Sequence, residues 1–194
     1  MNPVRCAGWV LTGALLFAAL PAAWAQAGDL DLMLLGQGGF SGSNNPDNNG
    51  FYTTGMNSYA FVGNLGYWFD DTWEAGLGAG PGRIDYQSCS SGLGCRNASH
   101  LSAQARIFAR YNFNSGFGGE SSFAGLQVVY MRVGPTLGNV WLLRPVAGYR
   151  FALLQDWSLE LSLGAGVPVA GDTVRFPTNY DVQMGLVIPL WNSQ

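Results

Sequence analysis

Apolar and polar residues alternate along most of the chain, with a period of two residues over several long segments. In residues 103–113, "AQARIFARYNF", every second residue is apolar or small, whereas the residues between them include Gln104 and Arg106. Residues 157–167 and 180–190 repeat the pattern. Because successive side chains of a β-strand point to opposite faces, this period predicts strands with one apolar face and one polar face.

Eight segments carry the alternation, and turn-forming residues separate them. The predicted strands are residues 29–40, 57–69, 73–85, 102–113, 122–133, 140–153, 157–169 and 179–191. Their connections alternate between short turns and long stretches rich in Gly, Asn, Ser and Pro. The turns are residues 70–72, 114–121 and 154–156, and the long loops are residues 41–56, 86–101, 134–139 and 170–178. Short turns at one end and long loops at the other are typical of membrane barrels, whose strands need about 9–11 residues to cross the bilayer. The sequence therefore predicts an all-β fold, an eight-stranded antiparallel up-and-down transmembrane β-barrel.

The composition favours a membrane barrel over a soluble sheet. Charged residues make up only 11% of the chain, which contains no lysine. A soluble β-sandwich or lipocalin-like barrel, the alternative, would carry many charges on its polar faces. Here those faces are rich in glycine instead, as at Gly76, Gly78 and Gly80. Small side chains suit the narrow interior of a small barrel. The net charge of −3 gives no reason to expect nucleic-acid binding.

The first 25 residues predict a cleaved secretory signal peptide. Arg5 gives the segment a positive start, residues 9–20 form an apolar run, and Ala23-Trp24-Ala25 is a small-x-small cleavage site. The run is shorter than the roughly 20 residues of a spanning helix, so a membrane anchor is disfavoured. We expect residues 1–25 to be removed and residues 26–194 to form a single exported barrel domain.

Charged and amide side chains on the glycine-rich faces are expected to fill the lumen as a bonded network, because buried charges must be paired. The residues expected in this network are Glu74, Gln104, Arg106, Arg110, Arg144, Arg150, Glu160, Asp181 and Gln183. A three-residue turn at 154–156 would place Arg150 opposite Glu160, and we expect these two to be bonded. In residues 122–133, either Gln127 or Arg132 must face lipid. We expect Gln127 inside, because a polar group costs more at mid-membrane than an arginine near the rim.

Aromatic residues flank the two shortest turns and the end of a third strand. The residues expected to form a girdle at the periplasmic membrane interface are Tyr67, Phe69, Trp73, Tyr111, Phe113, Tyr149, Phe151 and Trp157. Amphipathic rings concentrate at the level of lipid headgroups.

Two cysteines remain in the expected mature chain, Cys89 and Cys95, and they predict a disulfide that closes a small surface loop. By loop entropy such a bridge is worth about 2 kcal/mol. The only histidine is His100, so no metal site or other cofactor is expected.

The chain resembles the small eight-stranded outer-membrane barrels of diderm bacteria, the group that includes the transmembrane domain of outer-membrane protein A and outer-membrane proteins X and W. The resemblance covers the expected mature chain and rests on the strand count, "GYWFDDTWEAGLGAG", "AGYRFALLQDWSLELSLGAG" and the final alternating strand. It implies a monomer in the bacterial outer membrane, inserted by the outer-membrane assembly machinery and surrounded by outer-membrane lipid and lipopolysaccharide. That machinery commonly reads a last strand ending in an aromatic residue, whereas here residues 192–194 follow Trp191.

Three functions are consistent with such a barrel. The favoured one is non-enzymatic: envelope integrity, or surface interaction through extracellular loops such as residues 44–52 and 89–95. The alternative is a narrow porin-like channel for small or hydrophobic solutes. The third is a lipid A-modifying acyl hydrolase built on His100 and Ser102, with Asp85 on the preceding strand as a possible partner of the imidazole. We expect His100 and Ser102 to point inward, where an outer-leaflet lipid cannot reach them.

Overall fold

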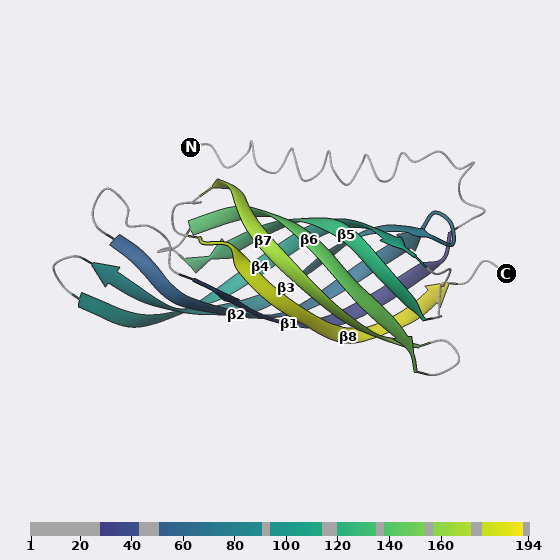
Figure 1. The fold of residues 1–194 in the computed structure, drawn as a ribbon, viewed down its shortest axis with the longest axis horizontal. Helices are drawn as coiled ribbons and strands as arrows, with labels where there is room; N and C mark the ends of the chain where they lie inside the picture. The colour runs from purple at the N-terminus through teal and green to yellow at the C-terminus, as the bar shows by residue number, and fades with distance from the viewer. Residues whose placement is uncertain are drawn as a thin grey trace.

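The computed structural model describes residues 28–42, 51–90, 94–113, 120–134, 138–153, 157–171 and 176–191. These residues form one closed antiparallel barrel in which each strand pairs with its neighbour in sequence and the last strand pairs with the first (Figure 1). The strands are β1 (Leu30–Ser41), β2 (Phe51–Trp68), β3 (Trp73–Ser90), β4 (Gly94–Asn112), β5 (Ser121–Val133), β6 (Gly138–Ala152), β7 (Ser158–Gly171) and β8 (Asn179–Trp191). The predicted fold class is confirmed. The expected signal peptide, most of the loop at 44–52 and the turn at 154–156 lie outside the described residues.

The outer surface of the barrel is apolar and its interior is polar. Along β7, Leu161 and Leu163 are 41% and 63% exposed, whereas Glu160 and Ser162 between and beside them are 2% and 1% exposed. A soluble barrel has the reverse arrangement, so this alternation fits a barrel surrounded by hydrocarbon. Within the described residues, no helix combines the length and the hydropathy that spanning a membrane requires.

Three strands extend well beyond the others at one end of the barrel. The pairing of β1 with β2 ends at Ser41 and Met56, and that of β4 with β5 ends at Ser102 and Val133. Residues 51–54 and 94–101 therefore pair only with β3 among the described residues, and together they form a three-stranded sheet that projects past the rim, on the left of Figure 1. We call this part the projecting sheet.

The projecting sheet corrects the prediction of a loop at residues 86–101 and shortens the predicted loop at 41–56. Beyond the pair of Arg83 and Leu101 at the rim, both faces of this sheet leave the hydrocarbon, so its residues carry no apolar alternation that would mark them as strands. The disulfide is confirmed: Cys89 and Cys95 are directly paired residues of β3 and β4, with Cα atoms 4.0 Å apart. It therefore links two strands of a hairpin instead of closing an irregular loop.

Candidate functional site: the polar lumen

The strand alternation places all nine residues of the expected network on the lumen side. Eight of them are buried and Gln104 is half-buried. Glycines make room for them, as at Gly164, where an added Cβ would lie 2.6 Å from Nε of Arg144. Residues that pair across two neighbouring strands lie side by side in the lumen: Glu74 of β3 is paired with Arg110 of β4, and Gly78 of β3 is paired with Arg106 of β4.

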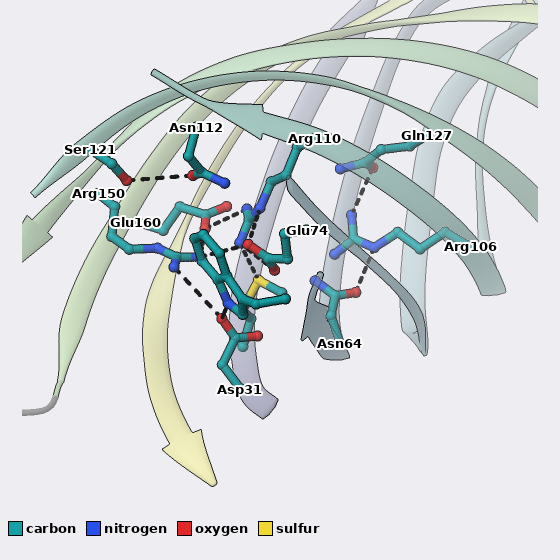
Figure 2. A network of polar contacts seen from close by, with 12 residues as sticks. Asp31, Asn64, Glu74, Arg106, Arg110, Asn112, Ser121, Gln127, Arg150 and Glu160 are labelled. Carbon is teal, nitrogen blue, oxygen red and sulfur yellow. Dashed lines mark hydrogen bonds and ion pairs between the residues drawn. The ribbon is translucent and has the colours of Figure 1, made fainter. Parts of the chain in front are cut away.

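Arg110 is the centre of a group of charges near the turn end of the barrel, which we call the turn-end cluster: Asp31, Glu74, Arg110, Arg150 and Glu160 (Figure 2). Its Nε and Nη2 atoms donate to the two carboxylate oxygens of Glu74 at 2.7 and 2.8 Å. Its Nη1 atom donates to Glu160 at 2.7 Å. Such paired, charge-assisted bonds are the strongest kind that a protein side chain makes.

Arg150 contacts the same two carboxylates from β6, two strands away from Arg110 on β4. It faces Glu160 across β6 and β7, so the predicted cross-strand pair is confirmed, with Nη2 3.5 Å from the carboxylate. The same atom lies 3.4 Å from Glu74. Nη1 is 3.6 Å from Asp31, which also accepts a 3.0 Å hydrogen bond from the indole of Trp68. Glu160 is therefore held more closely by Arg110 than by the partner that the sequence predicted.

A second group of polar residues lies further from the turn end, and we call it the central cluster: Asn64, Arg106, Gln127, Arg144 and Asp181. Arg144 forms a two-pronged ion pair with Asp181 and donates to Gln127 at 2.7 Å. Arg106 donates to Asn64 at 2.8 Å and to Gln127 at 3.3 Å, and its Nη2 atom is buried without a hydrogen-bond partner. Gln127 therefore faces inward, as predicted.

The buried charges of the described residues balance. The four arginines are Arg106, Arg110, Arg144 and Arg150, and the four carboxylates are Asp31, Glu74, Glu160 and Asp181. The turn-end cluster has three carboxylates and two arginines, whereas the central cluster has two arginines and one carboxylate. One cluster therefore carries one excess negative charge and the other one excess positive charge, so the two clusters attract each other. This attraction offsets part of the cost of an uncompensated charge in a low-dielectric interior.

Sequence reasoning missed Asp31, Asn64 and Trp68 as lumen residues. Asp31 stands between Leu30 and Leu32, so the alternation itself marks it as inward-facing. Trp68 was not recognised as a lumen residue because both of its neighbours in sequence, Tyr67 and Phe69, are outward-facing aromatic residues. Its indole N–H points to the lumen, where it finds the buried acceptor that such a group needs.

Beyond the central cluster, away from the turn end, the lumen contains a layer of amide side chains and then a layer of apolar side chains. Gln37 accepts from Gln183 at 3.0 Å and from Gln104 at 3.5 Å. A cavity of about 30 Å³ lies beside them, which is room for about two water molecules. Above it stands an apolar group that the sequence did not predict, consisting of Met56, Ile84, Tyr86, Val129, Val133, Val140, Leu142 and Phe176. The described lumen is thus filled with side chains along most of its length.

The aromatic residues form two belts on the outer surface. The eight predicted girdle residues lie at the turn end, and several of their rings are in contact, with centroids 5.0 Å apart for Tyr67 and Phe69 and 5.3 Å apart for Trp73 and Tyr111. A second belt at the opposite end was not predicted. We call it the outer aromatic belt, and it comprises Phe40, Tyr59, Tyr130, Trp141 and Tyr180.

His100 and Ser102 lie on the lumen side of β4, as expected. The His100 ring stacks on Tyr86 with centroids 5.8 Å apart, and Ser102 lines the 30 Å³ cavity. Asp85 alternates with the inward-facing Ile84 and therefore points to the opposite face, where it accepts a hydrogen bond from Arg83. The suggestion that Asp85 orients the imidazole is wrong. Among the described residues, no three His, Cys, Asp or Glu side chains are gathered as metal ligands.

Comparison with known proteins shows a shared fold without detectable sequence similarity. No protein-family model matches the chain, and a search of curated proteins found no match. Among solved structures, the outer membrane protein OprG from Pseudomonas aeruginosa superposes with a TM-score of 0.62 at 14% identity, covering 86% of this chain and 97% of that one. The N-terminal β-barrel domain of Pseudomonas aeruginosa OprF superposes with a TM-score of 0.54 at 12% identity, covering 84% and 97%. The chain therefore has the fold of the small eight-stranded outer-membrane barrels.

Proposed function

We propose that the protein is a monomeric, non-enzymatic barrel of the bacterial outer membrane with a closed lumen, and that it acts in envelope integrity or surface interaction through its extracellular end. The observation that carries the proposal is the balanced set of four arginines and four carboxylates, which fills the lumen instead of lining a pore. The two structural neighbours are outer-membrane barrels, which supports the same location.

The spacing of the two aromatic belts supports a membrane location. Trp73 belongs to the belt at the turn end, and ten residues further along β3, Arg83 pairs with Tyr59 of the outer aromatic belt. Ten residues of a strand tilted by about 45° rise roughly 23 Å, close to the apolar band of about 25 Å in outer-membrane barrels. Between the belts the outer face carries residues such as Leu65 and Leu77, which are 41% and 51% exposed.

A closed lumen follows from the strength of the contacts that cross it. Water and ions could pass only if the bidentate pairs of Arg110 and Arg144 opened. Each opening would leave a carboxylate in the barrel interior without its partner, and breaking a buried pair in this way costs about 3–5 kcal/mol. The function therefore belongs to the surfaces of the barrel, above all to the projecting sheet, which carries β3 and β4 far beyond the rim.

Conductance across a planar lipid bilayer tests the proposal. The purified, folded barrel should give no steady unitary current, whereas a general porin inserted under the same conditions should conduct. Insertion is verified separately by protease protection in vesicles, so that a protein that fails to insert is not mistaken for a barrel with a closed lumen. Steady currents would overturn the closed lumen and favour a narrow channel through the amide-lined cavity. Changed acylation of lipid A in cells that express the protein would overturn the non-enzymatic role.

A further inference from the structure

The exposed charges of the described residues are distributed unequally between the two ends of the barrel. The turn end exposes Asp70, Asp71 and Glu120, whereas the exposed arginines, Arg83, Arg96 and Arg132, are all at the opposite end, where the half-exposed Asp85 pairs with Arg83 and leaves a net positive charge. In the proposed orientation this end meets the outer leaflet. A positive rim there attracts anionic lipid headgroups.

Arg83 and Arg132 both lie on the outward face of the barrel beside a tyrosine of the outer aromatic belt. Arg83 of β3 pairs directly with Tyr59, and Arg132 of β5 follows Tyr130 two residues later on the same outward face. Tyrosine rings of such belts sit at headgroup level, so both guanidinium groups reach the phosphate region. One strand, β4, separates the two arginines, and their partners on it, Leu101 and Ala103, are two residues apart, which places the two arginine backbones about 12 Å apart. Two long side chains at this spacing can contact one headgroup.

The outward surface of β4 between the two arginines can receive an acyl chain. Leu101, opposite Arg83, is 82% exposed, and Ala103, opposite Arg132, is also exposed. A large exposed apolar side chain level with Arg83, followed down the strand by the small side chain that pairs with Arg132, matches a lipid whose charged group lies at the rim and whose tails run down the barrel.

Directly above Arg83, the outward face of the projecting sheet is hollowed. The hollow has a volume of about 540 Å³, and its polar lining comprises Arg83 and its partner Asp85 at the lower edge and the neutral side chains of Thr54, Asn57, Gln87, Asn97 and Ser99. It forms where the register of β2 shifts between Thr54 and Asn57, and Gly55 within the shift has a φ of 55°, which favours glycine.

The polar lining of the hollow is already held in place by its own bonds. Thr54 donates to Gln87 at 3.1 Å, and Gln87 donates to Asn97 at 3.4 Å. Asp85 fixes Arg83 through a 2.8 Å contact with Nε, and the two terminal nitrogens of Arg83 make no hydrogen bond or ion pair with the residues that the structure describes. Hydroxyls and amides with both donor and acceptor atoms are what sugar hydroxyl groups bind.

We propose that Arg83, Arg132 and this hollow bind the phosphorylated sugar headgroup of an outer-leaflet glycolipid. The arginines contact a phosphate, the amides and hydroxyls of the hollow contact the sugar, and Leu101 contacts an acyl chain. Arg132 makes no hydrogen bond or ion pair with any residue that the structure describes, so its charge is available to a ligand. The proposal rests on the proposed membrane location, because that location brings the belt into contact with lipid.

The test measures binding of a bisphosphorylated diglucosamine lipid to the folded full-length mature barrel in detergent, by native mass spectrometry. Arg83→Gln and Arg132→Gln should each weaken binding by roughly fivefold, the factor expected for one exposed phosphate contact. Arg96→Gln is the matched control, because Arg96 is also an exposed arginine but lies on the projecting sheet away from the belt. It should leave binding unchanged. Heat-modifiable gel mobility shows that each variant is folded.

The lipid with its phosphates removed should bind the parent protein as weakly as the phosphorylated lipid binds the double variant of Arg83 and Arg132. Asn57→Ala should weaken both lipids alike, because it changes only the contact with the sugar. Equal binding of the two lipids, or an equal effect of Arg96→Gln, would overturn the site. Tight binding of inorganic phosphate or of the deacylated glycan alone would overturn the lipid as the ligand.

These outcomes are independent of conductance. A barrel that conducts but discriminates between the two lipids would refute the closed lumen and keep the headgroup site. A closed barrel that inserts into vesicles but does not discriminate between them would refute the headgroup site alone.

Discussion

Replacement of Arg110 by methionine should destabilise the barrel far more than the same replacement of Arg106. The two residues lie four positions apart on the lumen face of β4, and both are buried. Methionine has a similar length in both places, so the lost packing is comparable. The difference between them is the partner: Arg110 contacts two carboxylates, whereas the bonds given by Arg106 go to two neutral amides.

The expected magnitudes follow from what each replacement leaves behind. Without Arg110, Glu74 and Glu160 keep only Arg150, at 3.4 and 3.5 Å. Removal of one member of a buried ion pair costs about 3–5 kcal/mol. Without Arg106, two amide oxygens lose one hydrogen bond each, but a buried nitrogen without a partner also disappears. A net cost of about 1–2 kcal/mol is expected there.

Equilibrium unfolding in urea from lipid vesicles measures the difference, with tryptophan fluorescence and gel mobility as independent probes. The midpoint should fall in the order parent, Arg106→Met, Arg110→Met, with an unchanged slope. A second replacement, Glu160→Gln, should restore part of the stability of Arg110→Met, because it removes one of the two uncompensated charges. If Arg106→Met costs as much as Arg110→Met, the lumen is not held together by the ion pairs described above.

Two further predictions concern a glycine and a turn. Gly164→Ala should lower the unfolding midpoint, because its Cβ would displace the guanidinium of Arg144; Gly166→Ala on the same face of β7 should be tolerated, since its nearest contact is at 3.4 Å. Asp70→Asn should destabilise the β2–β3 turn at neutral pH, because Asp70 accepts three hydrogen bonds at 2.7–2.8 Å that hold the pKa of its carboxyl below the ordinary value of 3.8. A group with a lowered pKa in the folded state contributes stability above its unfolded pKa and loses that contribution as the pH falls through the folded value. The difference in unfolding midpoint between Asp70→Asn and the parent should therefore vanish in acid, and a difference that persists there would refute the reasoning.

The strand pattern was enough to predict the barrel, because each strand has one face toward lipid and one toward the lumen. Period-two alternation then identifies both the strands and the inward side chains, including Arg110, Arg144 and Glu160. It cannot identify their partners. Arg110 of β4 reaches Glu160 of β7 across the lumen, and such contacts depend on how the closed sheet is staggered, not on any one hairpin.

The alternation of apolar and polar residues did not predict the structure where the strands no longer have lipid on one face and a polar lumen on the other. Beyond the rim, neither face of the projecting sheet meets hydrocarbon, so polar residues occupy both faces and the strands read as a loop. In the upper lumen the reverse occurs, because Ile84 and Val133 are apolar on an inward face that was expected to be polar. Alternation identifies which side chains share a face, but it does not identify the medium that the face meets at each height.

The distribution of charge in the lumen specifies the register in which the sheet closes. A slip of one residue at any strand turns every inward side chain outward. For β4 such a slip would turn Arg106 and Arg110 toward the hydrocarbon, at about 2–4 kcal/mol for Arg106 near mid-membrane and less for Arg110 close to the aromatic girdle. A slip of two residues keeps the faces but moves Arg110 away from Glu74, its direct partner in the ladder. The same holds where the barrel closes, because Asp31 of β1 must meet Arg150 and the indole of Trp68. A buried ion network adds little to stability compared with an apolar core, but it penalises every alternative pairing of these eight strands.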